Sequence, residues 1–246
     1  TDANSDLAGA ASSNTVTSTI TLTPINDAPT LTGTATASYT ENGAAIPLFS
    51  GITVTDVDDT DIVSASVSID ALGFISGDTL HFTDQSGITG SYDGATGLLT
   101  LTGTATLANY QTALRSITFS STSDDPTANT TATSRTLHWT VTDANSDAAG
   151  TQSSADKTST LTVIPAQDSP LMTAGGTLNY TENAAAAVID ATVTVLSDAD
   201  DTQMAGATVS IGSVVSGDAL DFTAQHGITG SYDGGTGILT LSGVTS

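Results

Sequence analysis

The chain has 246 residues and a formal net charge of −23, because 26 acidic residues stand against only three basic ones, Arg115, Arg135 and Lys157. A nucleic-acid-binding protein needs a basic face, and anionic membrane surfaces attract basic segments, so this composition excludes both kinds of partner. No segment approaches the roughly 20 apolar residues of a membrane-spanning helix, and the sequence contains no cysteine.

Short runs of Val, Ile, Thr and Leu alternate with turn signals along most of the chain, a pattern that predicts an all-β fold. The expected strands of the region 29–169 are, in chain order, Thr30–Tyr39, Ile52–Thr55, Val63–Ile69, Thr79–Thr83, Gly87–Tyr92, Leu98–Leu101, Ile117–Ser120, Thr136–Thr142 and Thr158–Ile164. Seven or more short antiparallel strands in one region of this length favour a Greek-key β-sandwich of the immunoglobulin type.

One short helix is expected per module. Leu107–Leu114 is the candidate, because its apolar residues recur at i, i+3 and i+7 and so lie on one helical face. Asp93-Gly94 predicts a tight turn between two strands of a hairpin. In the later strand around Trp139, apolar and polar residues alternate, which assigns this tryptophan to the core.

The sequence repeats itself over a long distance. The tetrapeptide Tyr-Thr-Glu-Asn that ends at Asn42 recurs with its end at Asn183, an offset of 183 − 42 = 141 residues, and Thr142–Asp147 repeats Thr1–Asp6 at the same offset. Solenoid repeats run to roughly 20–50 residues, so this period is that of a domain. We therefore expect tandem modules, with residues 1–28 as the end of one module plus a linker, 29–169 as a complete module and 170–246 as the first part of the next. The last strand of the first module is expected within Thr1–Thr23.

Oxygen-rich side chains recur at corresponding places in the modules. An Asp-x-Asp-Asp cluster follows the second strand, beginning at Asp56 and again at Asp198. Calcium takes about six to eight oxygen ligands from short loops, and carboxylates packed this closely repel one another unless a cation lies among them. The candidate metal ligands are Asn26, Asp27, Glu41, Asp56, Asp58, Asp59, Asp143, Asn145, Gln167, Asp168, Asp198, Asp200 and Asp201. Isolated aspartates such as Asp93 are expected to be turn residues instead.

These motifs resemble the cadherin repeat, and more closely the cadherin-like repeats of very large bacterial surface adhesins. The matching stretches are Thr40–Asn42, Val54–Asp58, Val141–Asp143 and Ile25–Pro29, in the family's order along the module. The resemblance implies calcium ions between consecutive sandwiches. The ligands that it implies at the first junction are Asn26, Asp27, Asp56, Asp58 and Asp143. Those that it implies at the second are Glu41, Gln167, Asp168, Asp198 and Asp200.

Two further expectations follow from the resemblance. Asp2 and Asn4 would face a junction upstream of residue 1. The family's mid-module acidic motif is missing, and Asn109–Arg115 offers no carboxylate in its place. We therefore expect one or two ions per junction rather than three.

The function that the resemblance implies is an extracellular one at the cell surface. The chain would be part of a calcium-stiffened stalk that projects the binding domain of a bacterial adhesin. An alternative is a structural subunit of an extracellular filament or surface layer, with head-to-tail association between chains. A sugar-binding sandwich needs an exposed aromatic platform, which a chain with 4% aromatic residues does not favour. We expect no enzymatic activity, because none of the three histidines recurs in both copies of the repeat.

Overall fold

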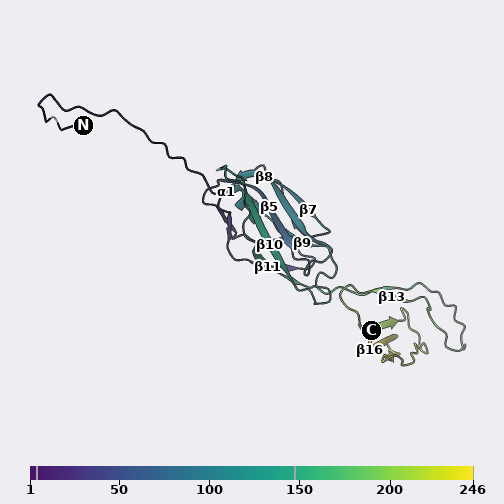
Figure 1. Cartoon of the computed structure of the whole chain (residues 1–246). Coiled ribbons are helices and arrows are strands. Elements are labelled where there is room, and N and C mark those ends of the chain that lie inside the picture. The colour runs from purple at the N-terminus through teal and green to yellow at the C-terminus, as the bar shows by residue number, and fades with distance from the viewer. Residues whose placement is uncertain (4, 147, 246) are drawn as a thin grey trace.

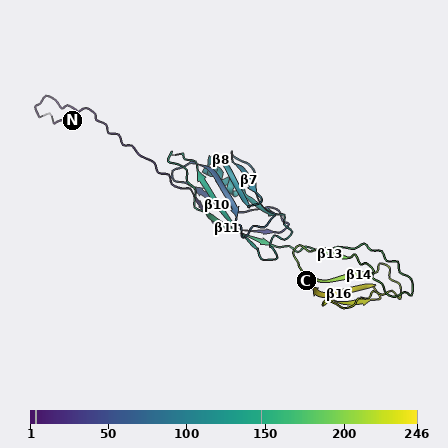
Figure 2. The same cartoon turned by 45° about the vertical axis from the view of Figure 1, so that its right-hand side comes forward.

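The structure of the chain, a computed structural model, describes residues 1–3, 5–146 and 148–245. Its described part is mostly β-structure with one short helix. An extended N-terminal segment leads into a body formed by β1–β11, and a smaller group of strands, β12–β16, follows it (Figures 1 and 2). The all-β prediction is therefore confirmed.

The body consists of a large sheet and a second layer packed against it. The elements are β1 (Thr30–Thr32), β2 (Thr36–Thr40), β3 (Ile46–Pro47), β4 (Thr53–Thr55), β5 (Asp61–Ile69), β6 (Asp78–His81), β7 (Thr89–Asp93), β8 (Leu98–Thr106), α1 (Leu107–Arg115), β9 (Thr118–Ser121), β10 (Ser134–Asp143) and β11 (Lys157–Ile164). The six-stranded sheet has the order β2-β11-β10-β5-β8-β7, and the second layer contains the pair β1-β4, the sheet β3-β9-β6 and the helix. Within the large sheet only the β2–β11 pair is parallel.

The core lies between these layers. Along β10 every second residue points inward, so Leu137, Trp139 and Val141 are fully buried while the residues between them are more exposed. Trp139 meets Phe49 of the opposite layer edge-to-face, with ring centroids 5.5 Å apart. The Nε1–H of this tryptophan donates to Ser159 Oγ at 2.8 Å, which satisfies its one polar group. The assignment of Trp139 to the core is confirmed.

The helix forms where the apolar spacing predicts it. Thr106 caps its N-terminus by accepting a hydrogen bond from the backbone N–H of Asn109 at 3.3 Å. Tyr110 and Leu114 are fully buried on the inner face. The preceding strand β8 is longer than predicted and runs directly into this helix.

The expected strand Thr30–Tyr39 is wrong as a single element. It divides at Gly33 into β1, which pairs with β4, and β2, which pairs with β11 in the other layer. Gly33 has a φ of +114°, and a Cβ there would lie 2.7 Å from the carbonyl oxygen of Gly51. Because only glycine tolerates this conformation and this close approach, the chain crosses between layers at this residue.

The strand expected within Thr1–Thr23 does not form in the structure. Residues 9–29 carry no strand, and Val16, Ile20 and Leu22 are 84–85% exposed. A strand needs a neighbour for its backbone groups, and the backbone hydrogen bonds described for residues 1–3 and 5–23 include none to another strand.

The C-terminal strands repeat part of the body. They are β12 (Leu171–Thr173), β13 (Thr194–Ser197), β14 (Met204–Ser210), β15 (Thr229–Asp233) and β16 (Ile238–Thr245). Tyr232 pairs with Leu239 across the β15–β16 hairpin, as Tyr92 pairs with Leu99 across β7–β8. The sequence repeat, whose offset is 232 − 92 = 140 residues at this hairpin, therefore corresponds to a repeat of strand pairing.

Candidate metal centres

Two groups of predicted ligands lie at opposite ends of the body, and the topology of the large sheet puts them there. Strand β11 runs antiparallel to β10 and parallel to β2. Asp143, at the end of β10, therefore lies at one end of the body. Glu41, just after β2, lies at the other end, where β11 leads into the following linker. We call the first group, Asn26, Asp27, Asp56, Asp58, Asp59 and Asp143, the first site. We call the second group, Glu41, Gln167, Asp168, Asp198, Asp200 and Asp201, the second site.

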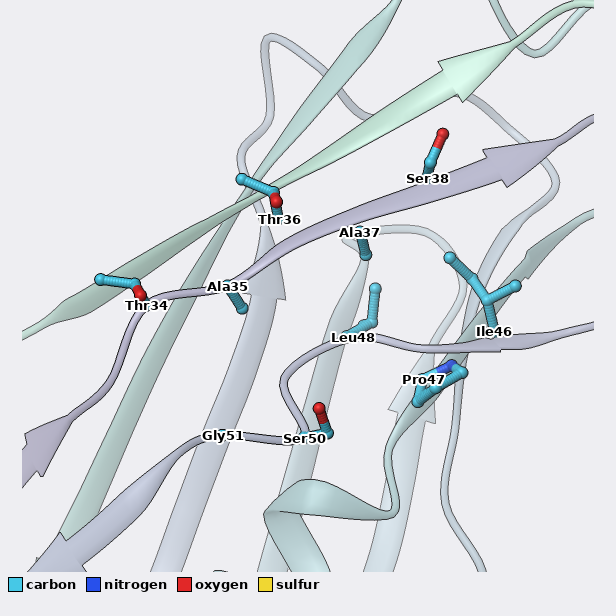
Figure 3. Close-up of a pocket in the computed structure, with 10 residues that line it drawn as sticks. All are labelled: Thr34, Ala35, Thr36, Ala37, Ser38, Ile46, Pro47, Leu48, Ser50 and Gly51. Atoms are coloured by element: carbon cyan, nitrogen blue, oxygen red, sulfur yellow. The ribbon is translucent and has the colours of Figure 1, made fainter.

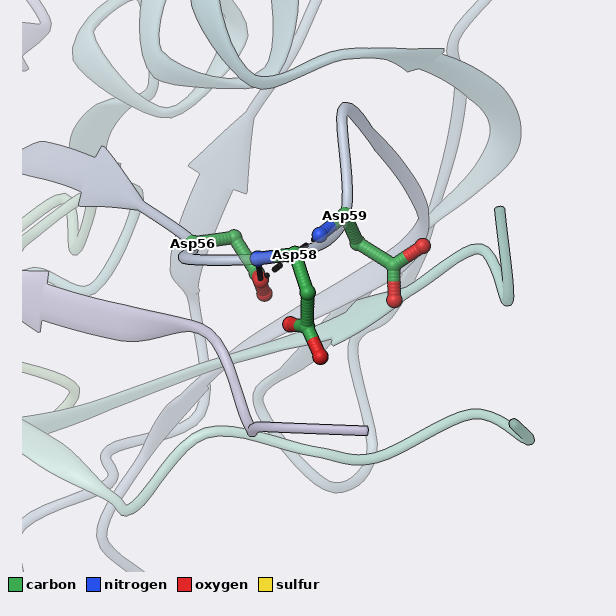
Figure 4. A group of neighbouring side chains, drawn as sticks. All are labelled: Asp56, Asp58 and Asp59. Atoms are coloured by element: carbon green, nitrogen blue, oxygen red, sulfur yellow. Dashed lines mark hydrogen bonds between the residues drawn. The ribbon is translucent and has the colours of Figure 1, made fainter. Parts of the chain in front are cut away.

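A tight turn after β4 gathers three carboxylates of the first site (Figure 4). The backbone N–H groups of Asp58 and Asp59 both donate to Asp56 Oδ1, at 3.1 and 3.0 Å. This local bonding is typical of aspartate in turns. One carboxylate oxygen from each of Asp56, Asp58 and Asp59 lies within 4.8 Å of the others, a spacing that could hold one metal ion.

The N-terminal linker is fixed against this turn by side-chain and backbone contacts. Asn26 is 6% exposed, and its Nδ2 donates to Oδ2 of the fully buried Asp143 at 3.0 Å. The other oxygen of Asp143 accepts the N–H of Gln152 at 2.7 Å. The backbone N–H of Asp27 donates to Asp58 Oδ2 at 3.0 Å, whereas the Asp27 side chain is exposed. The structure thus brings together residues that are 117 positions apart.

The second site repeats these hydrogen bonds between the linker and the carboxylate turn with corresponding atoms. Asp168 N–H donates to Asp200 Oδ2 at 3.2 Å, as Asp27 does to Asp58, and Asp201 N–H donates to Asp198 Oδ1 at 3.1 Å, as Asp59 does to Asp56. One oxygen from each of Asp198, Asp200 and Asp201 again lies within 4.8 Å of the others. The backbone arrangement is therefore a property of the repeat rather than of one loop.

Glu41 is a residue of the body that contacts the linker of the second site. It is 4% exposed, and its Oε2 accepts the backbone N–H of Ala166 at 2.8 Å. Its own N–H donates to Ile164 O at 2.9 Å, which extends the β2–β11 pairing by one residue. The left-handed Asn42, with a φ of 59°, then turns the chain away and leaves the glutamate against the linker.

The strongest indication of a ligand is a set of buried oxygens that have no hydrogen-bond partner. Among the described residues there are six such side-chain atoms, and all six belong to predicted metal ligands. They are Asn26 Oδ1, Glu41 Oε1, Asp56 Oδ2, Asp58 Oδ1, Asp59 Oδ2 and Asp168 Oδ2. A buried acceptor without a partner costs about 1–3 kcal/mol, and more when it is charged. These oxygens belong to residues of the first and second sites, so both sites offer oxygen ligands of the kind that a hard divalent cation takes.

The electrostatics of both sites disfavour bare carboxylates. Burial raises the pKa of Glu41, and the nearby charges of Asp168 and Asp200 raise it further, against the opposing Ala166 N–H. Burial also raises the pKa of Asp56 and of Asp168. Each of these groups is thus held in an environment that favours a proton or a cation beside it.

These pKa shifts predict an unusual pH response in the metal-free protein. A carboxyl group whose pKa is higher in the folded state binds more protons when folded, so it stabilises the fold more as the pH falls toward its unfolded value. The unfolded values are 4.5 for Glu41 and 3.8 for the two aspartates. In a chelator, the melting temperature is therefore expected to rise as the pH falls from neutrality toward the unfolded value of 4.5 of Glu41. Below about pH 4 hydrogen-bonded turn carboxylates such as Asp93, whose pKa is lowered, reverse the trend.

The control for this pH series is the same series in excess calcium. His138 also has a raised pKa, from its hydrogen bond to Asp156, and it too adds stability on acidification, but it lies outside both sites. When calcium is present, only the part of the rise in melting temperature that comes from the site carboxylates should disappear. A pH response that is identical with and without calcium would contradict the assignment of the shift to the sites.

Asn145, a predicted ligand, and its neighbour Ser146 make contacts that the sequence did not indicate. Asn145 is exposed, has a φ of 54° and accepts the N–H of Gly150 through Oδ1 at 2.5 Å, so the contacts described for it are those of a turn residue. Its neighbour Ser146, which sequence reasoning missed, donates both its N–H and its Oγ–H to Asp59 Oδ1. Asn4 lies outside the described residues.

Two further carboxylates near the second site were also missed. Asp124 raises the pKa of Asp168, and Asp125 raises that of Glu41, so both residues contribute negative charge there. They precede Pro126 in the loop between β9 and β10, a position that reads in sequence as an ordinary turn. No spacing rule connects this loop with the linker, which is why the sequence pattern did not identify them.

The body also has a groove between the edge strands β2 and β3 (Figure 3). Hydroxyl-bearing, small and aliphatic residues line it, among them Thr36, Ser38, Ile46, Pro47 and Ser50. No aromatic or charged side chain is part of this lining. A sugar site would need such groups, so the groove offers no support for a sugar-binding function.

Among the described residues no helix is both long enough and apolar enough to cross a membrane. No family model matches the sequence, and no curated protein matches it. The argument for function therefore rests on the two sites and on the repeat that carries them.

Proposed function

We propose that the chain binds calcium at the first and second sites and acts as a stiffened extender, the stalk of an extracellular surface adhesin. The observation that carries this proposal is the set of six unpartnered buried oxygens, all of which lie on the two linkers or on residues facing them. Calcium prefers such carboxylate and amide oxygens, at about 2.3–2.6 Å. The modules in this proposal are cadherin-like Greek-key sandwiches.

The mechanism is mechanical. In the first site, Asn26 and the N–H of Asp27 come from the linker, whereas Asp58 and Asp143 come from the body. In the second site, Asp168 comes from the linker, Glu41 from the body and Asp200 from the strands that follow. A cation held by such a set joins parts of the chain that a bare linker would leave free to rotate. The array would then hold a binding domain away from the cell.

One observation favours the alternative of a filament. Val16, Ile20 and Leu22 are exposed, whereas Leu161 and Val163, the counterparts of Ile20 and Leu22 in β11, are buried. A segment with this pattern pairs readily with another strand, and a neighbouring chain could supply that strand. Electron microscopy of the purified protein with calcium distinguishes the two, because a stalk gives single rods and a subunit gives assemblies that lengthen with concentration.

The calcium sites are tested by replacing Asp58 with alanine. This change removes a central carboxylate of the first site, so we expect it to weaken binding there by at least tenfold in a calorimetric titration. Asp93→Ala is the matched control, because the Asp93 carboxylate only caps its hairpin turn, accepting from Ala95 N–H at 2.9 Å and Thr96 Oγ at 2.8 Å. Equal losses in both variants, or no calcium binding by the unaltered chain, would refute the proposal.

A further inference from the structure

The two sites share the hydrogen bonds of their carboxylate turns but differ in other members, since Asp143 belongs only to the first site and Glu41 only to the second. Asn26 of the first linker corresponds to Gln167 of the second, which is longer by one methylene group. The neighbouring aspartates, Asp27 and Asp168, donate their N–H groups to corresponding carboxylates in both sites. One difference between the sites can therefore be traced to the amide side chain at this linker position.

In the first site the amide nitrogen donates to a carboxylate of β10 and not to the Asp56–Asp59 turn. Asn26 Nδ2 donates to Asp143, and Asn26 Oδ1 is left buried with no partner. The oxygens Asp58 Oδ1 and Asp59 Oδ2 are likewise unpartnered. All three atoms are acceptors, so Asn26 has the geometry of a ligand that adds an oxygen to the site.

In the second site the amide nitrogen lies among the carboxylates. Gln167 Nε2 donates to Asp201 Oδ2 at 2.9 Å, to Asp200 Oδ1 at 3.4 Å and to the backbone oxygen of Asp168 at 3.1 Å. Asp200 Oδ1 and Asp201 Oδ2 are the counterparts of the two aspartate oxygens that are free in the first site. Gln167 thus supplies hydrogen-bond donors where the first site leaves acceptors open.

We propose that Gln167 competes with the cation at the second site, so that this site takes calcium more weakly than the first. This inference rests on the proposed function. Calcium can bind the second site fully only after the amide nitrogen has left Asp200 and Asp201, and those charge-assisted hydrogen bonds are lost in the exchange. The partially positive N–H groups also soften the repulsion between the carboxylates, which lowers the gain from a cation there.

The consequence is that the two junctions become rigid at different calcium concentrations. As calcium rises, the first junction becomes rigid before the second, and over the intermediate range the chain has one stiff joint and one hinge. We expect the two dissociation constants to differ by about tenfold, which corresponds to about 1.4 kcal/mol.

Calorimetric titration with calcium chloride tests this, with each site isolated in the full chain by a variant that disables the other. The Asp200→Ala variant gives the calcium affinity of the first site, because its second site is disabled, and Asp58→Ala gives that of the second. Gln167→Ala, added to Asp58→Ala, is expected to tighten the second site about tenfold, because it removes the competitor. Asn26→Ala, added to Asp200→Ala, is expected to weaken the first site, because it removes a ligand. Gln167 is exposed, so its truncation does not threaten the fold.

The decisive result is that Gln167→Ala and Asn26→Ala, at equivalent positions, change the affinity for calcium in opposite directions. A weaker second site after Gln167→Ala would make the glutamine a ligand and overturn the inference, and so would equal affinities of the two sites in the chain with Gln167 intact. Either result leaves the proposed function standing, since calcium still binds. Failure of both Asp58→Ala and Asp200→Ala to bind calcium, together with no binding by the unaltered chain, would refute the proposed function itself.

Discussion

Replacing Asp78 by alanine is expected to destabilise the body by about 3–5 kcal/mol, because it leaves the charge of Arg135 buried without its partner. Both side chains are 0% exposed, and Arg135 Nε lies 2.6 Å from Asp78 Oδ2. Arg135 Nη2 adds a second contact, to Asp78 Oδ1 at 3.3 Å. The remaining guanidinium donors go to the carbonyl oxygens of Pro126, Ala132 and Ser134 at 2.6, 2.8 and 3.4 Å, which cannot neutralise the charge of Arg135.

Denaturant unfolding monitored by the fluorescence of Trp139 measures this loss. Asp93→Ala, an exposed aspartate in a turn, is the control and is expected to change stability far less. The double variant Asp78→Leu with Arg135→Met should recover part of the loss, since a buried pair can be replaced by apolar side chains of similar size. A loss below 1 kcal/mol in Asp78→Ala would show that the pair does not anchor the 122–133 loop to the sheet.

This ion pair illustrates what sequence patterns could not predict. Asp78 and Arg135 are 57 residues apart, and only the placement of β6 beside the loop before β10 brings them together. Alternation and turn residues are local signals, so they predicted α1, the β7–β8 hairpin and most strands to within a few residues. They missed β3, which has two residues and no alternation to detect.

The same limit applies to the metal centres. The Asp56–Asp59 turn was predictable because its candidate ligands are neighbours in sequence and repeat at Asp198–Asp201. The partnership of Asn26 with Asp143 was expected only through the resemblance to a family, and the structure brings these two side chains into contact. Ser146 lies in the repeated stretch Thr142–Asp147 but nothing in it indicated a bond to Asp59, and Asp124 belongs to no motif. The different bonding of Asn26 and Gln167 depends on side-chain direction, which a sequence does not contain.

Removing calcium is expected to loosen the chain and to lower its melting temperature. A ligand that binds only the folded state stabilises it by about 2.7 kcal/mol per site at a hundredfold excess over its dissociation constant. Small-angle scattering with calcium and with chelator should show a change in maximum dimension, because the linkers around Asn26 and Gln167 lose their fixed angles. An unchanged melting temperature together with an unchanged maximum dimension would contradict the stalk mechanism.

Because the chain has a charge of −23, general screening by salt has to be excluded as the cause of any calcium effect. Any salt screens the repulsion between 26 acidic residues and so stabilises the compact state without binding at a site. Sodium chloride and magnesium chloride at matched ionic strength measure this general screening. The double variant Asp58→Ala with Asp200→Ala keeps a charge of −21 by loss of two carboxylates, −23 + 2, yet lacks the central ligand of each site. A calcium response that vanishes in this variant belongs to the two sites, whereas one that persists belongs to the overall charge.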